Sequence, residues 1–91
     1  MARDFEKWLK KEPEVVEIDG VQIKIPVLGS DVMHLVVKAS SKDEVKQAQG
    51  LNGLVDYVLR YNFPDIKPEE LKQIDIKIRA KIAEAIATQL Q

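Results

Sequence analysis

Residues 15–25 read VVEIDGVQIKI, and the alternation of apolar and polar side chains in this stretch decides the fold class. A period of two is typical of a β-strand with one buried face. The Asp-Gly pair at 19–20 tolerates the positive φ angles of a tight type I′ turn. This turn places Ile18 opposite Val21, so that the apolar side chains of both strands share one face. We therefore predict a β-hairpin over residues 15–25.

A two-stranded hairpin is only marginally stable by itself, so we expect its apolar face to lie on helices. Its edges expose backbone N–H and C=O groups, and another strand can add to such an edge. Pro26 ends the second strand, because proline cannot donate a ladder hydrogen bond.

A short helix is predicted before the hairpin, within residues 1–12. Phe5, Trp8 and Leu9 recur at steps of three and four residues among charged side chains, and Pro13 ends the pattern. A helix of about ten residues is barely stable alone, so Trp8 must either dock on the core or contact a partner. We favour docking on the core.

The remaining residues, 30–91, form the predicted helical part. Its first helix is expected over residues 31–38 with Ser30 as the N-cap, although three consecutive apolar residues, Leu35, Val36 and Val37, leave a strand as the alternative.

The main helix of the core is predicted to follow. Ser41 and Glu44 have the spacing of a capping box, and apolar positions recur at helical steps as far as Leu59. Gly50 and Gly53 inside this helix each cost about 1 kcal/mol relative to alanine. They mark either a break near Gly50, which we favour, or a close crossing by another backbone.

The last helix is predicted to run from Pro68, a residue typical of a first helical turn, nearly to the C-terminus. One apolar stripe of this helix consists of Leu71, Ile74, Ile78, Ile82 and Ile86. A narrower alanine strip lies nearly opposite and consists of Ile76, Ala80, Ala83 and Ala87. A second apolar strip needs another helix or leaves methyl groups in water, which makes it a candidate contact surface. Alternatively, alanine is simply a good helix former, and the hairpin or first helix covers the strip.

These elements predict one domain, residues 1–91, that is mainly α with a small β-hairpin (α+β). Three to four helices pack around one core, and the hairpin lies near the N-terminus. A chain of 91 residues has too little material for a second core.

Composition limits the function classes. The chain has no cysteine and begins without the apolar stretch of a signal peptide, which favours a cytoplasmic location. Apolar runs are too short to span a membrane. Fourteen basic and fifteen acidic residues give a net charge of -1, which makes nucleic acid an unfavourable partner.

No catalytic, metal or cofactor site is expected. His34 is the only histidine, and no Asp or Glu has a spacing that would clearly make it a base or a ligand. Gly50 and Gly53 have the GxxG spacing of a nucleic-acid-binding loop without its flanking basic residues. We therefore predict a protein that is not an enzyme.

One part of the chain resembles a known family. A hydrophobic pair at Val58-Leu59, a Pro-Asp pair at 64–65, a Glu-Glu-Leu helix start at 69–71 and the segment 82–86 together resemble the tail assembly chaperones of long-tailed bacteriophages. The similarity covers roughly residues 15 to 88. It implies a protein that binds the tape-measure protein in the host cytoplasm, keeps it soluble and helps to recruit tail-tube subunits.

The leading prediction is thus a non-enzymatic protein-binding protein that assists tail assembly, itself a possible homo-oligomer. A structural subunit of a virion or other assembly is the first alternative. A small nucleic-acid-binding regulator built on the basic residues between 67 and 81 is the second. The predicted protein-binding residues are Phe5, Trp8, Ile76, Ala80, Ala83 and Ala87.

Overall fold

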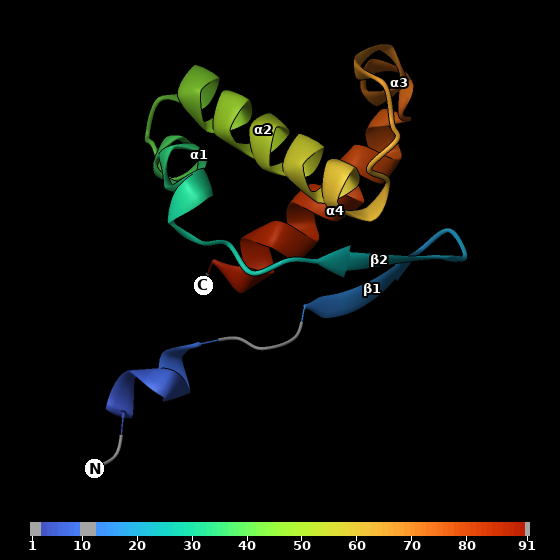
Figure 1. The fold of residues 1–91 in the computed structure, drawn as a ribbon. Helices are drawn as coiled ribbons and strands as arrows, with labels where there is room; N and C mark the ends of the chain where they lie inside the picture. Colours follow the sequence, from blue (N-terminus) through green and yellow to red (C-terminus); the bar gives the residue numbers. More distant parts are fainter. Residues whose placement is uncertain (1–2, 10–12, 91) are drawn as a thin grey trace.

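The computed structural model describes residues 3–9 and 13–90 and has its α-helices on one side of a hairpin (Figure 1). The elements, in chain order, are the 3₁₀ helix η1 (Asp4–Trp8), the strands β1 (Glu14–Ile18) and β2 (Val21–Ile25), the 3₁₀ helix η2 (Ser30–Val32), and the α-helices α1 (Met33–Ala39), α2 (Glu44–Asn62), α3 (Pro68–Gln73) and α4 (Ile76–Gln89). The predicted fold class, mainly α with a small hairpin, is confirmed.

The hairpin has the predicted register. Ile18 lies opposite Val21, and the two turn residues, Asp19 and Gly20, have φ angles of 50° and 80°. Both angles lie in the left-handed region that a type I′ turn requires. On the face that meets the helices, Ile25 is 1% exposed. The short-range pattern was sufficient here because the turn residues fix the register.

The core forms where the hairpin, α2 and α4 meet. Helix α4 contacts both α2 and β1, and α2 contacts β2. In Figure 1, α4 crosses behind α2. Leu54 and Val58 of α2 and Ile82 and Ile86 of α4 are fully buried in this cluster. The first predicted stripe of the last helix thus supplies part of the core, as its helical spacing requires.

Helix α2 is continuous through Gly50, and the predicted break there is wrong. A Cβ at Gly50 would overlap the backbone N of Ala39 and lie 2.7 Å from the carbonyl oxygen of Leu35. The alternative, a close crossing by another backbone, is therefore the correct interpretation. Glycine lets α1 lie directly against α2.

The starts of α1 and α2 differ from the predictions. Asp43, not Ser41, is the N-cap of α2, and its Oδ1 accepts a hydrogen bond from the N–H of Val45 at 2.9 Å. Ser41 instead accepts a hydrogen bond from the N–H of Asp43 through its Oγ. Ser30 is not an N-cap either, because it is the first residue of η2 and the turn closes through backbone groups.

The predicted last helix is divided into α3 and α4. Ile74 has an extended ψ of 130°, and Asp75 then accepts a hydrogen bond from the N–H of Lys77 at 2.8 Å as the N-cap of α4. The side chain of Asp75 thus competes with continuation of the helix, as aspartate does at helix starts. The prediction of one unbroken helix from Pro68 is therefore wrong.

The N-terminal segment is less helical than predicted. η1 is one 3₁₀ segment, and the rest of the predicted helix, residues 1–2 and 10–12, lies outside the described residues. Trp8 is 76% exposed, so the favoured prediction that it docks on the core is wrong. Its ring forms one wall of an open hollow of about 230 Å³ with Val27, Leu28 and Leu90.

Candidate protein-binding groove

A mostly apolar groove of about 290 Å³ lies between α2 and the start of α4. Its lining residues are Leu51, Asn52, Lys72, Ile74, Ile76, Arg79, Ala80 and Ala83. We call this feature the α2/α4 groove. Its volume is near the lower end of the range in which proteins hold small ligands or a few side chains of a partner.

The break between α3 and α4 creates the groove. Because the chain leaves helical geometry at Ile74, α4 restarts at Ile76 in a new direction, and Ile76 is left 79% exposed at the lip. One and two turns further along α4, Ala80 is exposed and Ala83 is half-buried against the core. Alanine side chains are too short to fill the space beside Leu51, so a hollow remains.

The structure brings together three of the six predicted protein-binding residues. Ile76, Ala80 and Ala83 line the α2/α4 groove. Ala87 is half-buried further along α4 and does not line it. Three of the four residues of the predicted alanine strip therefore have the open surroundings that a contact surface needs, while Ala87, nearer the C-terminus, does not.

The two predicted N-terminal residues lie apart from the groove. Trp8 lines its own hollow beside Leu90, at the other end of α4. Phe5 is 43% exposed, and the guanidinium of Arg3 lies 4.7 Å from the centre of its ring. A cation over an aromatic face covers part of that face. Phe5 and Trp8 are thus exposed apolar residues of a separate surface.

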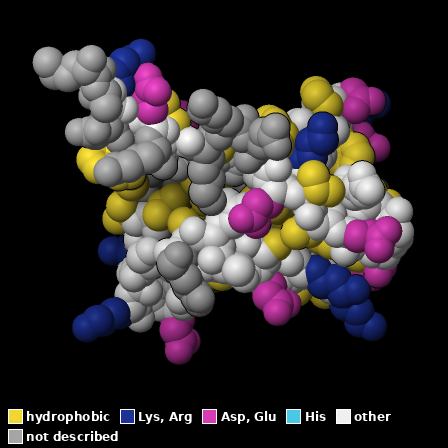
Figure 2. Space-filling model, turned by 90° about the horizontal axis from the view of Figure 1, so that it is seen from below, with side chains coloured by type: hydrophobic (Ala, Val, Ile, Leu, Met, Phe, Trp, Pro, Cys, Tyr) yellow, Lys and Arg dark blue, Asp and Glu magenta, His cyan; other side chains and the backbone are white. Residues whose placement is uncertain are grey.

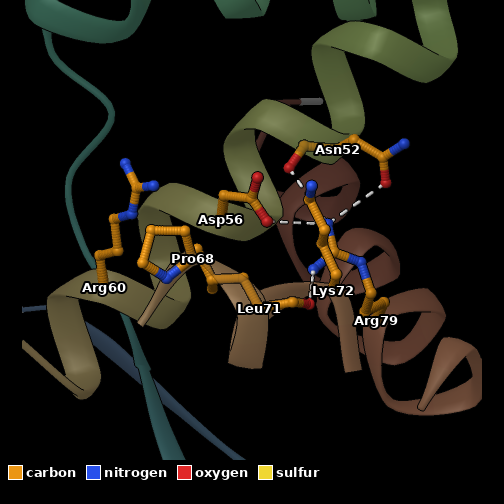
Figure 3. A pocket seen from close by; sticks show the side chains of 7 residues that line it. All are labelled: Asn52, Asp56, Arg60, Pro68, Leu71, Lys72 and Arg79. Atoms are coloured by element: carbon orange, nitrogen blue, oxygen red, sulfur yellow. Dashed lines mark hydrogen bonds and ion pairs between the residues drawn. The ribbon is translucent and has the colours of Figure 1, made fainter. Parts of the chain in front are cut away.

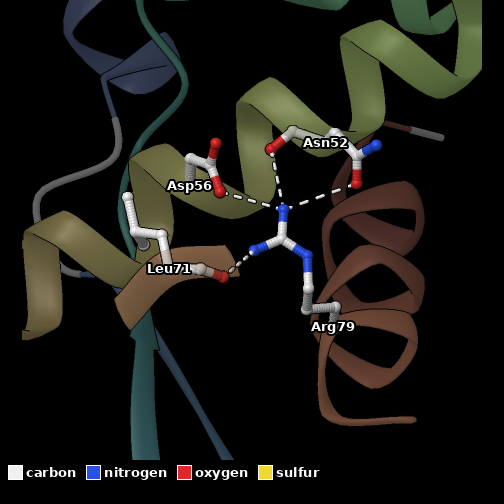
Figure 4. Close-up of polar contacts among 4 residues, drawn as sticks. All are labelled: Asn52, Asp56, Leu71 and Arg79. Atoms are coloured by element: carbon white, nitrogen blue, oxygen red, sulfur yellow. Dashed lines mark hydrogen bonds and ion pairs between the residues drawn. The ribbon is translucent and has the colours of Figure 1, made fainter. Parts of the chain in front are cut away.

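Arg79 lines both the α2/α4 groove and a neighbouring hollow. Figure 4 shows its polar contacts. Its Nη2 donates to Oδ1 of Asp56 at 2.9 Å and approaches the carbonyl and side-chain oxygens of Asn52 at 3.4 Å. Its Nη1 donates to the carbonyl oxygen of Leu71 at 3.1 Å. This single side chain, 17% exposed, joins α4 to α2 and α3. We call the arrangement the Arg79 clasp.

The neighbouring hollow has a volume of about 400 Å³, and its wall combines apolar side chains with charged and polar ones (Figure 3). Arg60 and Lys72 stand at its rim, and both are exposed. Asp56 is its only acidic residue, and it already receives the guanidinium of Arg79. Basic side chains therefore outnumber acidic ones beside the groove, which favours acidic side chains on anything that binds there.

Several groove residues were not predicted as binding residues. Leu51 and Ile74 were assigned to the apolar positions of the main helix and the last helix. Asn52 received no role, and Arg79 belonged only to the basic residues of the nucleic-acid alternative. The signal that could have revealed them is Asp75, because an N-cap residue in the middle of a helical pattern predicts a restart and a change of direction. With a restart at 76, Ile74 ends α3 and no longer belongs to the same helix as Ile78.

A second, almost wholly apolar hollow of about 190 Å³ lies between the hairpin and α4. It is walled by Ile18, Ile23 and Leu59 on one side and by Ile78 and Ile82 on the other. Phe63, 38% exposed, stands at its margin. This hollow is continuous with the core, and its one charged lining residue, Asp19, is already paired with Lys81, so we regard the hollow as imperfect packing.

Polar chemistry in the described residues is sparse. No group of three or more metal-ligating side chains is present among them. His34 is exposed. Burial, followed by the nearby negative charge of Asp31, raises the pKa of Tyr57 above its ordinary value, which keeps this phenol protonated at neutral pH.

Among residues 3–9 and 13–90, no helix is both long and apolar enough to cross a membrane. Comparison of the chain with protein-family models, with curated proteins and with solved structures finds no match. The functional argument therefore rests on the geometry of the groove.

Proposed function

We propose that this chain is a non-enzymatic protein-binding protein that holds a helical segment of a partner in the α2/α4 groove. The observation that carries the proposal is Ile76, a large aliphatic side chain that is 79% exposed at the lip of an apolar hollow. An exposed apolar side chain beside a mostly apolar groove is typical of a surface that a partner covers.

The shape and charge of the groove favour an amphipathic helix as the partner segment. Ala80 and Ala83 let another helix approach α4 closely, while Leu51 and Ile76 offer aliphatic walls to its apolar residues. Lys72 stands beside the groove and favours acidic side chains on the polar face of that helix. Such a segment would lie with its apolar residues toward α4.

The resemblance to tail assembly chaperones supplies a specific candidate partner. Under this proposal the chain binds the tape-measure protein of a long-tailed phage in the host cytoplasm, keeps it soluble and assists tail assembly. Exposed apolar side chains next to charged ones fit a chaperone that covers apolar segments of another protein before assembly.

The test is co-production with the tape-measure protein encoded in the same genome, followed by a binding measurement on the purified pair. The informative variant is Ile76→Glu. Ile76 is exposed and occupies the first turn of α4, where an acidic side chain favours the helix dipole, so the variant keeps its fold. We expect it to weaken binding by about 10- to 100-fold, the effect of losing a buried aliphatic anchor.

Val45→Glu is the matched control. Val45 is 66% exposed and lies in the first turn of α2, but it does not line the groove. This variant should bind like the wild type. Equal weakening by both substitutions would show that the groove is not the binding site, and a wild-type chain that neither binds nor solubilises the tape-measure protein would contradict the proposed chaperone function.

A further inference from the structure

The two edges of the hairpin differ in whether their outward N–H and C=O groups are hydrogen-bonded. Ile18 and Val21 flank a two-residue turn and therefore form a hydrogen-bonded pair, after which bonded and non-bonded pairs alternate. Lys24 on β2 and Val15 on β1 form a non-bonded pair, as Glu17 does with Gln22. The N–H and C=O groups of these residues point away from the partner strand.

The edge of β2 is occupied at Lys24 by a side chain of α2. Oδ1 of Asn62 accepts from the N–H of Lys24 at 2.8 Å, and Nδ2 of Asn62 donates to the carbonyl oxygen of Lys24 at 2.8 Å. Nδ2 also donates to the carbonyl oxygen of Val58 within α2, which fixes the amide. Asn62 thus takes the place of a neighbouring strand.

The edge of β1 has no such cover. Within the part of the chain that the structure describes, the sheet contains only β1 and β2, and no hydrogen bond is made to the outward backbone groups of Val15 and Glu17. Val15 is also 54% exposed on the outer face of the hairpin. An open strand edge of this kind pairs readily with another strand.

We propose that a second copy of this chain pairs with this edge, β1 to β1 and antiparallel about Val16, and so forms a continuous four-stranded sheet. In this register Val15 of each copy lies opposite Glu17 of the other. These are the residues whose backbone groups point outward, so each pair can exchange two hydrogen bonds. The interface uses the same patch on both copies, as a twofold dimer requires.

Charge favours this register over one centred on Glu17, and it places opposite charges on either side of Val15 when two copies pair. Pairing about Val16 sets Glu17 opposite valine and Glu14 opposite Ile18, so no two acidic side chains face each other. A shift centred on Glu17 would oppose two glutamates, which destabilises a strand pair. On the outer face, Val15 would lie between Lys24 of its own hairpin and Glu17 of the second copy, so that opposite charges flank an apolar side chain that becomes covered.

Pairing also strengthens a weak element. A two-stranded sheet is marginal, whereas four strands with one apolar face on helices form an ordinary two-layer arrangement. The side that the hairpin presents carries apolar side chains among charged ones (Figure 2). The α2/α4 groove takes no part in this contact, so dimerisation is independent of the proposed function.

The first test is Val15→Pro, measured as molar mass by light scattering over a wide concentration range. Proline at 15 removes an outward N–H without removing a hydrogen bond between β1 and β2, and proline is tolerated at edge positions of this kind. We expect the wild type to pass from one chain to two as concentration rises. The variant should need at least a tenfold higher concentration, because one donor per copy is lost.

Val15→Thr is the matched control, because it keeps the N–H and the β-branched shape, and it should dimerise like the wild type. Ala80→Glu should also dimerise normally, since Ala80 is exposed and the substitution changes the groove while leaving the edge intact. A wild type that stays monomeric throughout would overturn the proposal. So would a dimer that Val15→Pro leaves unchanged while Ala80→Glu dissociates it.

Cross-linking gives a second readout that does not depend on proline. The chain contains no cysteine, so Val16→Cys introduces a single thiol. In the proposed register the two Val16 residues form a non-bonded pair, with Cα atoms about 4.5 Å apart, within reach of a disulfide. Val16→Cys should form a linked dimer under mild oxidation, and Gln22→Cys on β2 should not. The reverse pattern would refute β1 pairing.

Discussion

At the residue scale, Arg79 is the side chain whose loss should affect the fold around the groove most directly. It contacts Asp56 and Asn52 of α2 and the carbonyl oxygen of Leu71 in α3. We expect Arg79→Lys to lower the free energy of unfolding by about 1–2 kcal/mol, because a lysine ammonium lacks the planar fork that reaches both helices at once. Urea denaturation followed by circular dichroism measures the change.

Lys81→Ala is the control for that prediction. Lys81 pairs with Asp19 at 3.1 Å, but both side chains are more than half exposed, so the pair contributes little. The control should change the free energy of unfolding by less than about 0.5 kcal/mol. If both variants lose the same amount, Arg79 is only another surface ion pair and the Arg79 clasp has no structural role.

Sequence patterns predicted single residues well where the cause is local. The Asp19-Gly20 turn could be predicted from backbone geometry alone, and this turn determined the register of the two strands. The spacing of Ile76, Ala80 and Ala83 predicted that they share one side of a helix, and the structure places all three along one groove. Their role as contact residues stays a prediction. Arg79 could not be predicted in this way, because its partners come from other elements.

At the element scale, Gly50→Ala tests the crossing of α1 and α2. In an isolated helix this substitution stabilises by roughly 0.5–1 kcal/mol. Here the added Cβ would lie 2.7 Å from the carbonyl oxygen of Leu35 and 2.8 Å from the carbonyl carbon of Lys38. We therefore expect the opposite sign, a loss of about 2 kcal/mol or more, since α1 must move away.

Gly53→Ala is the comparison for the crossing, measured by the same denaturation experiment. The Cβ there would meet Leu35 at the far end of its side chain, 2.6 Å from Cδ2, and this flexible side chain can move at less cost than backbone. The loss should be clearly smaller than at Gly50. A Gly50→Ala variant more stable than the wild type would contradict the close approach of the two backbones.

Helix α2 shows which features of the fold sequence patterns can predict and which they cannot. Periodicity predicted that α2 exists and which face it buries, because both depend on helical spacing. It could not decide between a break and a crossing at Gly50, since the answer depends on where α1 lies in space. The division at Ile74 failed for a related reason: Asp75 favours a new helix start, while the isoleucine pattern favours continuation.

At the scale of the whole molecule, the hairpin and the helices share one apolar cluster. Ile23 and Ile25 of β2 meet Leu54 and Val58 of α2 within it, and Ile82 of α4 belongs to the same cluster. Because neither layer buries its apolar face without the other, we expect them to unfold together. The groove and the β1 edge lie outside this cluster, which is why they remain open for partners.

Ile82→Ala tests that coupling. Ile82 is fully buried and also forms part of the wall of the 190 Å³ hollow beside Ile18, so the substitution enlarges a space that the surroundings already fail to fill. We expect a loss of about 3 kcal/mol in the free energy of unfolding, with helical circular dichroism and hydrogen exchange of the hairpin amides shifting together. Ile76→Ala, the same substitution at an exposed position of the same helix, should change stability by less than about 0.5 kcal/mol. The contradicting outcome is exchange of the hairpin amides at a lower denaturant concentration than the one at which the helices unfold. The hairpin would then be a separate unit held on the surface. In that case the four-stranded sheet would have to draw its stability from the second copy instead of from α4.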